Sequence, residues 1–172
     1  LPQAALVGYT NAGKSTIMNA FIRMSTPPLE QEPEEKSSRN VESEAGEEGK
    51  LVFEKDMLFA TLDTSIRSIK APDKKDFLLS DTVGFIEDLP TGLIKAFRST
   101  LREAAGADLL LIVLDSSDPY WTMHKKVTEE TLAELGAGNI PRLYVMNKAD
   151  LIPGRTWALP RVKEDEIWLS AK

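Results

Sequence analysis

The sequence contains no cysteine and only one histidine, His124. Disulfide bonds and thiolate metal sites are therefore excluded, and a lone histidine cannot by itself build a histidine metal centre or a histidine-centred catalytic triad. Because His124 lies in a polar stretch with helical spacing, we expect it to be an ordinary surface residue. No apolar run approaches the length of about 20 residues that crosses a bilayer, and the first residues show no secretory signal pattern.

The net charge of the 172-residue chain is −6, and most of it is concentrated in one segment. Residues 30–50 contain eight glutamates against three basic residues, whereas the rest of the chain carries 18 basic and 19 acidic residues. Such an evenly charged body lacks the strong basic footprint of a protein that binds nucleic acid over its whole surface. A local basic face remains compatible with these numbers.

Short apolar runs alternate with segments of helical periodicity along the chain. The strand-like runs cover residues 3–7, 64–69, 77–80, 109–114, 142–146 and 167–169, and helical spacing covers 14–24, 93–105 and 122–135. The run 109–114 is apolar throughout, as in a central parallel strand with both faces covered. This order predicts a three-layer α/β fold with a mostly parallel sheet, in which ligands bind at the carboxyl ends of the strands.

The length and the hydrophobic content of 42% suit one domain over residues 1–172. Residues 25–50 are an exception, because they are rich in proline, glutamate, serine and glycine and cannot bury enough apolar surface to offset the entropy of ordering. We interpret them as a disordered acidic insertion; the alternative, a solvated charged helix, is interrupted by three prolines. The sequence stops just after its last strand-like run, so we expect a fragment that lacks the final helix of the fold.

The first motif that carries chemistry follows the first strand-like run and reads G-x-x-x-x-G-K-S from Gly8 to Ser15. Its glycines allow successive backbone N–H groups to point at phosphate oxygens, and the helix that starts at Lys14 adds the positive end of its dipole. We expect Lys14 to reach the β- and γ-phosphates and the Ser15 hydroxyl to be a magnesium ligand. The predicted phosphate-binding residues are Gly8, Tyr9, Thr10, Asn11, Ala12, Gly13, Lys14, Ser15 and Thr16.

A second motif, D-T-V-G, runs from Asp81 to Gly84 after the strand-like run 77–80. A carboxylate at that strand end can hold magnesium opposite Ser15, and the N–H of Gly84 can approach the γ-phosphate. Alone the motif would be a common turn, but its position after the phosphate loop makes it specific. Thr61 and Thr64 are both candidates, from residue type alone, for a threonine that closes on the metal when the γ-phosphate is present.

Two further motifs predict a guanine site, N-K-A-D at 147–150 and S-A-K at 170–172. The carboxylate of Asp150 can accept from N1–H and the 2-amino group of guanine, whereas adenine has neither donor and would leave the buried carboxylate unpaired. We expect Asn147 to tie this loop to the phosphate loop and Lys148 to lie over the base. A backbone N–H that meets guanine O6 is expected from the segment formed by Ser170, Ala171 and Lys172.

The words GYTNAGKST, LFATLD, DTVGFI and NKADL, together with LP..LI.AFRSTL, closely resemble the G domain of HflX-type GTPases, in the Obg–HflX branch of translation GTPases. The resemblance covers essentially the whole chain except residues 25–50. It implies a Ras-like topology, binding of GTP or GDP with Mg²⁺, and association with the RNA and proteins of the large ribosomal subunit. It also assigns the switch threonine to Thr61 rather than Thr64, and it matches Asn11 to an asparagine that helps to hold a potassium ion (K⁺) in related GTPases.

Two features depart from this family pattern. The word LFATLD continues as Thr64-Ser-Ile, where family members commonly have Pro-Thr-Thr, and the acidic insertion that precedes it is unusually long. Both bear on the switch segment and neither bears on the identity of the nucleotide. The amino-terminal domain, which carries much of the ribosome contact in this family, is expected to be missing from the fragment.

Together the motifs predict in-line attack of water on the γ-phosphate of GTP, with Lys14 and Gly84 as catalytic residues and Ser15 and Asp81 as metal ligands; the resemblance adds Thr61 to both sets. Ras-like enzymes orient this water with a glutamine that follows the glycine. Here that position is Phe85, which cannot hydrogen-bond water, so we expect slow hydrolysis unless a partner or potassium supplies what is missing.

Three alternatives share part of this pattern. A nucleotide-dependent binding switch with negligible turnover competes because of Phe85. A P-loop ATPase is disfavoured by Asp150. The G domain of a membrane iron transporter would share several of these motifs. We expect a monomeric, cytoplasmic GTPase that has GTP and the large ribosomal subunit as partners and no membrane segment in this part of the chain.

Overall fold

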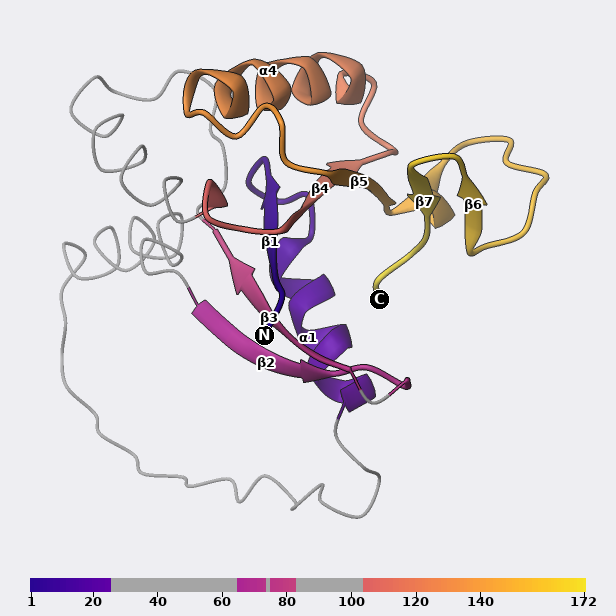
Figure 1. Ribbon diagram of the computed structural model, residues 1–172. Coiled ribbons are helices and arrows are strands. Elements are labelled where there is room, and N and C mark those ends of the chain that lie inside the picture. The colour runs from indigo at the N-terminus through magenta and orange to yellow at the C-terminus, as the bar shows by residue number, and fades with distance from the viewer. Residues whose placement is uncertain (26–64, 74, 83–103) are drawn as a thin grey trace, which may run out of the picture.

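A seven-stranded sheet runs through the residues that the computed structural model describes, which are 1–25, 65–73, 75–82 and 104–172 (Figure 1). Its strands lie in the order β2-β3-β1-β4-β5-β7-β6. The bounds are β1 Gln3–Gly8, β2 Ser65–Lys70, β3 Asp76–Asp81, β4 Leu109–Asp115, β5 Arg142–Asn147, β6 Arg161–Lys163 and β7 Glu166–Trp168. The strands β3, β1, β4, β5 and β7 pair in parallel, and the edge strands β2 and β6 are antiparallel to their neighbours.

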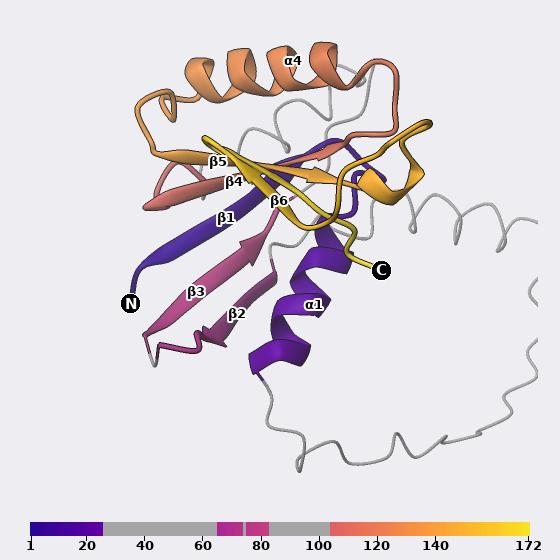
Figure 2. The ribbon, with the colours of Figure 1, turned by 90° about the vertical axis from the view of Figure 1, so that its right-hand side faces the viewer.

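Two helices cover opposite faces of this sheet, α1 Lys14–Ser25 on one side and α4 Trp121–Glu134 on the other (Figures 1 and 2). Alternate residues of a strand point to opposite faces, so β4 serves both layers. Leu110 belongs to the core that includes Leu132 of α4, and Leu111 belongs to the core that includes Ile17 of α1. The three-layer α/β fold with a mostly parallel sheet that the sequence predicts is therefore confirmed.

The predicted boundaries agree with the observed strands and helices to within one residue at each end, wherever the structure describes both. The sequence analysis missed β6, which has three exposed residues and no apolar periodicity, and it missed the three-residue 3₁₀ helix η1 Ala149–Leu151. The predicted insertion 25–50 and the predicted helix 93–105 lie almost wholly outside the described residues. Within the described part, no helix is long and apolar enough to cross a bilayer.

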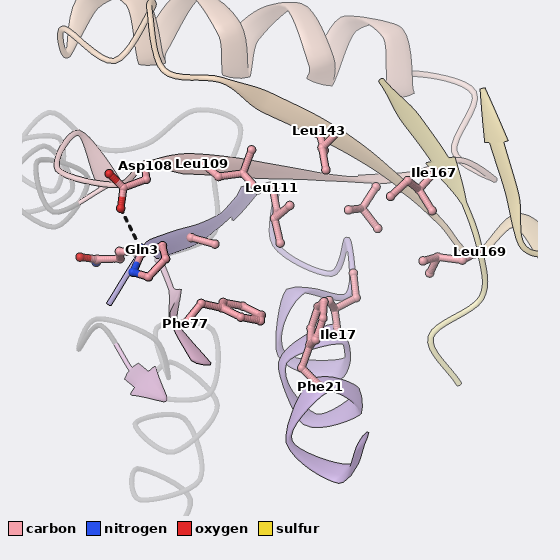
Figure 3. A pocket seen from close by; sticks show the side chains of 13 residues that line it. Gln3, Ile17, Phe21, Phe77, Asp108, Leu109, Leu111, Leu143, Ile167 and Leu169 are labelled. Carbon is pink, nitrogen blue, oxygen red and sulfur yellow. Dashed lines mark hydrogen bonds between the residues drawn. The ribbon is translucent and has the colours of Figure 1, made fainter. Parts of the chain in front are cut away.

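The helix α1 covers only part of its face of the sheet. Beside it lies an open apolar groove of about 360 Å³, lined by side chains that include Phe21 from α1, Leu111 from β4 and Ile167 from β7 (Figure 3). Among the described elements no helix lies over this groove.

The substitution Leu110→Ala tests the layered core. Leu110 is fully buried between β1, β5 and α4, so the variant should lose about 3 kcal/mol of unfolding free energy through lost burial and a residual cavity. Ile66→Ala on the edge strand β2, where the side chain is 50% exposed, should cost less than about 1 kcal/mol. Urea unfolding measures both, and equal losses would contradict the assignment of Leu110 to the core.

Candidate nucleotide-binding site

The predicted phosphate loop is the connection between β1 and α1. It leaves the sheet at Gly8, where a Cβ would lie 2.3 Å from the carbonyl oxygen of Val113. Asn11 and Gly13 have φ angles of 65° and 101°, so the backbone turns back before α1 begins. The amide of Ile17 donates to the carbonyl of Gly13 at 3.0 Å. The N–H groups before Ile17 lie ahead of this first helical bond, at the end of the helix that attracts anions.

The side chain of Lys14 folds back across this loop. It is 7% exposed, and its Nζ donates to the carbonyl oxygens of Gly8 at 3.0 Å and Tyr9 at 2.9 Å. Burial lowers the pKa of Lys14 to about 8, against the opposing effect of the Asp81 carboxylate. The loop thus presents a buried ammonium group beside the backbone of a glycine-containing turn, which is the chemistry that a phosphate needs.

Ser15 and Asp81, which lie far apart in the sequence, meet beside the loop. The Ser15 hydroxyl donates to Asp81 Oδ2 at 3.1 Å, and Asp81 is 3% exposed. Burial raises the pKa of Asp81, while the charge of Lys14 and the hydrogen bond from Ser15 lower it. The second carboxylate oxygen, Oδ1, is buried and has no hydrogen-bond partner among the described residues. A hydroxyl and an unsatisfied carboxylate oxygen form a donor set that fits Mg²⁺, which prefers oxygen ligands.

Asn147 links the phosphate loop to both predicted base-binding segments. It ends β5 and is 3% exposed. Its side-chain Nδ2 donates to the carbonyl oxygen of Ala12 at 3.0 Å, and its Oδ1 accepts from the amide of Ala171 at 3.1 Å. The amide of Ala149 also donates to the carbonyl of Leu169 at 3.1 Å. The structure therefore brings the N-K-A-D and S-A-K segments together against the phosphate loop.

Lys148 crosses from the base-binding loop to the phosphate loop. Its backbone is left-handed, with φ of 57°. Its Nζ donates to the carbonyl oxygen of Asn11 at 2.6 Å and to Asp115 Oδ2 at 2.9 Å. Both contacts hold the tip of the side chain, so the methylene stem between this tip and the backbone can serve as one wall of a base pocket.

Asp150 is the middle residue of the short 3₁₀ helix η1 Ala149–Leu151. Its Oδ2 forms an ion pair with Lys172 Nζ at 2.6 Å, and hydrogen bonds from Lys172 and Ser170 lower the pKa of Asp150. Its Oδ1 has no hydrogen-bond partner among the described residues. An ionised carboxylate with an oxygen available can accept from a guanine N–H.

His124 is not the ordinary surface residue that its sequence context suggests. Its side chain is only 15% exposed and its ring stacks on Tyr9 of the phosphate loop, with ring centroids 4.0 Å apart. The helix α4 carries it to this position, with Asp118 Oδ2 at 3.8 Å from His124 Nδ1. Sequence spacing could not reveal this contact, because 115 residues separate the two rings along the chain.

The remaining predicted site residues fall into two groups. Ala12 is buried, Thr10 is half-buried, and Asn11 and Thr16 are exposed along the loop. Thr61 and Gly84, predicted for the metal and the γ-phosphate, lie outside the described residues, as does Phe85. A further segment missed by the sequence analysis is Asp115–Ser117, which contacts the base-binding loop; its only signal is a polar run directly after a buried strand.

Three features thus meet at the carboxyl ends of the parallel strands: a phosphate loop, a carboxylate suited to Mg²⁺ (Asp81) and an aspartate suited to guanine (Asp150). This is the arrangement of a P-loop G domain. The sequence profile of the family described as 50S ribosome-binding GTPase matches residues 3–148, and the chain belongs to that family.

Curated relatives agree with this assignment. The chain is 45% identical over 150 residues to the GTPase HflX of Akkermansia muciniphila, an alignment that covers 87% of this chain and 28% of that protein. It is 38% identical to the GTPase HflX of Escherichia coli strain K12, with 100% of this chain and 35% of that protein covered. The resemblance to HflX-type GTPases is confirmed, and the chain spans about a third of the length of these relatives.

Solved structures support the fold. A GTP-binding protein from the archaeon Sulfolobus solfataricus, in complex with GDP, superposes with a TM-score of 0.67 at 24% identity. The match covers 99% of this chain and 47% of that one. The Ras-like G domain topology expected from the sequence is therefore present.

The substitution Gly13→Ala tests the contact between the phosphate loop and Asn147. A Cβ at Gly13 would lie 2.2 Å from Asn147 Nδ2, and the φ of 101° adds backbone strain. We expect a loss of about 3 kcal/mol or more in unfolding free energy, together with a changed NMR signal of the Asn147 side-chain amide.

The matched control for this variant is Gly136→Ala. Gly136 also has a positive φ, 81°, but nothing lies within 4 Å of an added Cβ. The control should therefore cost only the backbone strain, about 1–2 kcal/mol, and leave the Asn147 amide signal in place. Equal losses in both variants, with the Asn147 signal unchanged, would show that Gly13 is not required for this contact.

Proposed function

We propose that this protein binds GTP and GDP, hydrolyses GTP slowly and acts on the large ribosomal subunit. The observation that carries the nucleotide part is the junction at Asn147, which ties the phosphate loop at Ala12 to the base-binding segment at Ala171. A site that binds phosphate alone does not require a link between its phosphate loop and a base-binding segment. A nucleoside triphosphate does require one, because its base and its phosphates must be held at a fixed separation. The family description and the HflX relatives support the ribosomal part.

Guanine is the base that this site would select. The buried Oδ1 of Asp150 needs a donor, and guanine supplies N1–H and the 2-amino group. Adenine would leave the carboxylate without those donors, a penalty that discriminates strongly in a site built from polar groups. Lys148 would lie along the face of the base, and the backbone of Ser170–Lys172 would meet O6.

Ser15 and Asp81 would hold Mg²⁺, with Thr61 completing the set from the switch segment, and the bound ion would neutralise developing charge on the phosphates. Lys14 would exchange its carbonyl contacts for β- and γ-phosphate oxygens, and the N–H of Gly84 would approach the γ-phosphate. A potassium ion beside Asn11 would add positive charge near the same oxygens. These are the groups through which the chain would stabilise in-line attack by water.

Slow turnover follows from the residue after Gly84. Phe85 cannot orient a water molecule, so in this proposal a partner or potassium supplies the missing contribution. The same observation supports a second candidate function, a nucleotide-dependent binding switch with negligible turnover. In either case we propose that the protein acts as a cytoplasmic monomer.

The test of the proposed function is GTP turnover by the intact protein in potassium buffer, with and without large ribosomal subunits. We expect the subunits to stimulate phosphate release by tenfold or more, on the order seen when a partner completes a GTPase site. Sodium in place of potassium should slow the reaction, and ATP should not compete. Tight binding of GDP without stimulated turnover would instead favour the binding switch.

The affinity for GDP should fall as the pH rises above about 8. Burial lowers the pKa of Lys14 to about 8 in the free site, and bound phosphate would raise it again, so binding at higher pH must take up a proton. Each pH unit above 8 should weaken binding by up to about tenfold until the lysine pKa of the complex is reached.

Lys14→Arg is the control, because the guanidinium stays charged throughout this range. The variant can bind more weakly, but the pH dependence due to Lys14 should vanish, while any titration of GDP itself remains in both profiles. Isothermal titration calorimetry in two buffers of different ionisation enthalpy measures the proton uptake directly. An identical pH profile for both proteins would disprove the assignment to Lys14.

A further inference from the structure

The last residue of β4, Asp115, and the residue that follows it, Ser116, contact the base-binding loop, although they belong to none of the motifs. In the parallel pairing of β4 with β5, Asp115 lies opposite Asn147. The chain therefore leaves β4 beside the point where β5 delivers Asn147 and Lys148. Ser116 and Ser117 follow in the same turn, so short polar side chains are concentrated next to the loop.

Ser116 fixes the backbone of Asn147. It is 8% exposed, and both its amide, at 2.9 Å, and its hydroxyl, at 2.6 Å, donate to the carbonyl oxygen of Asn147. Two donors on one buried carbonyl define the plane of the peptide that follows. That peptide leads directly into the left-handed backbone of Lys148.

Asp115 fixes the other end of Lys148. Its Oδ2 accepts from Lys148 Nζ at 2.9 Å, while its Oδ1 accepts from the amide of Ser117 at 3.0 Å and the Ser117 hydroxyl at 2.5 Å. Burial alone would raise the pKa of Asp115, but the hydrogen bonds from Ser117 and Lys148 lower it overall. The hydrogen bonds from Ser117 therefore hold the carboxylate in one orientation. In that orientation its negatively charged Oδ2 faces the ammonium group of Lys148.

Ser116 thus fixes the peptide that precedes Lys148, and Asp115 and the carbonyl oxygen of Asn11 together hold its Nζ. The Asp115 and Lys148 side chains are 23% and 31% exposed, so their ion pair contributes little to overall stability. Its effect is geometric, because it suppresses rotamers of a long side chain that would otherwise swing away from the base.

We propose that Asp115 and Ser116 are positioning residues of the nucleotide site, which set the place of Lys148 and Asn147 before the base arrives. This inference rests on the proposed binding of guanine nucleotides. Neither residue is assigned contact with the nucleotide; both act through residues of the N-K-A-D motif. Preorganisation of this kind improves affinity because less freedom is lost on binding.

The test compares GDP affinity in the intact protein and its Asp115→Asn variant. The amide keeps the shape of the side chain but removes the charge that holds Lys148. We expect affinity to fall roughly three- to tenfold, with KM for GTP raised by a similar factor and kcat at saturating GTP unchanged. Ser116→Ala should also weaken GDP binding.

Asp118→Asn is the matched control, since it removes the same charge from the same turn and leaves the contacts of Lys148 in place. If local negative charge merely repelled the nucleotide, both variants would bind more tightly, and the proposal would be wrong. In a Lys148→Ala background, Asp115→Asn should cause no further loss; an undiminished loss in that background would also overturn the proposal.

A measurement without nucleotide separates this inference from the proposed function. Hydrogen exchange of the Ala149 amide, which donates to Leu169, should accelerate in Asp115→Asn and stay unchanged in Asp118→Asn. Wild-type protein that fails to bind GDP would refute the proposed function and the binding role together. Wild-type protein that binds GDP, with Asp115→Asn equal to it in affinity and exchange, would refute only the positioning role.

Discussion

The buried side chain of Asn147 is the contact on which the geometry of the whole site depends. One carboxamide group satisfies the carbonyl of Ala12 and the amide of Ala171, so three loops share a single anchor. The contact also explains the glycine at position 13, since a Cβ there would occupy the space of Asn147 Nδ2. These hydrogen bonds couple the motif residues physically, so a change in the backbone of one loop must shift the other two.

This anchor is available because of the topology of the sheet. The strands β1, β3, β4, β5 and β7 run in parallel, so their carboxyl ends reach the same edge. Residues 135 positions apart, Ala12 and Asn147, are therefore within hydrogen-bond distance. The cores on both faces of β4 hold the strands in register, and a slip by one residue would exchange their buried sets. The packing of the two cores therefore fixes the positions of the loops at the carboxyl edge of the sheet.

The sequence alone was enough to predict the strands, the order of the loops and the place where they meet, because apolar periodicity and glycine-rich turns are local signals. It was not enough for β6, whose three exposed residues are held by pairing with β7. The sequence analysis also missed the stacking of His124 on Tyr9 and the ion pair between Asp115 and Lys148. Both depend on how far one element is rotated against another, which no local pattern encodes.

The electrostatics of the site explain why such a rigid frame is needed. Lys14 and Asp81 are both almost fully buried, and each only partly offsets the desolvation of the other, since the pKa of Lys14 is still lowered and that of Asp81 is still raised. Buried charged groups need polar partners in place of the water that they lose. The backbone carbonyls of Gly8 and Tyr9 are the partners of Lys14, and the Ser15 hydroxyl is the partner of Asp81. Burial in this fold therefore disfavours the charged forms of Lys14 and Asp81, and a bound phosphate group beside the lysine or a cation beside the aspartate would favour those charged forms.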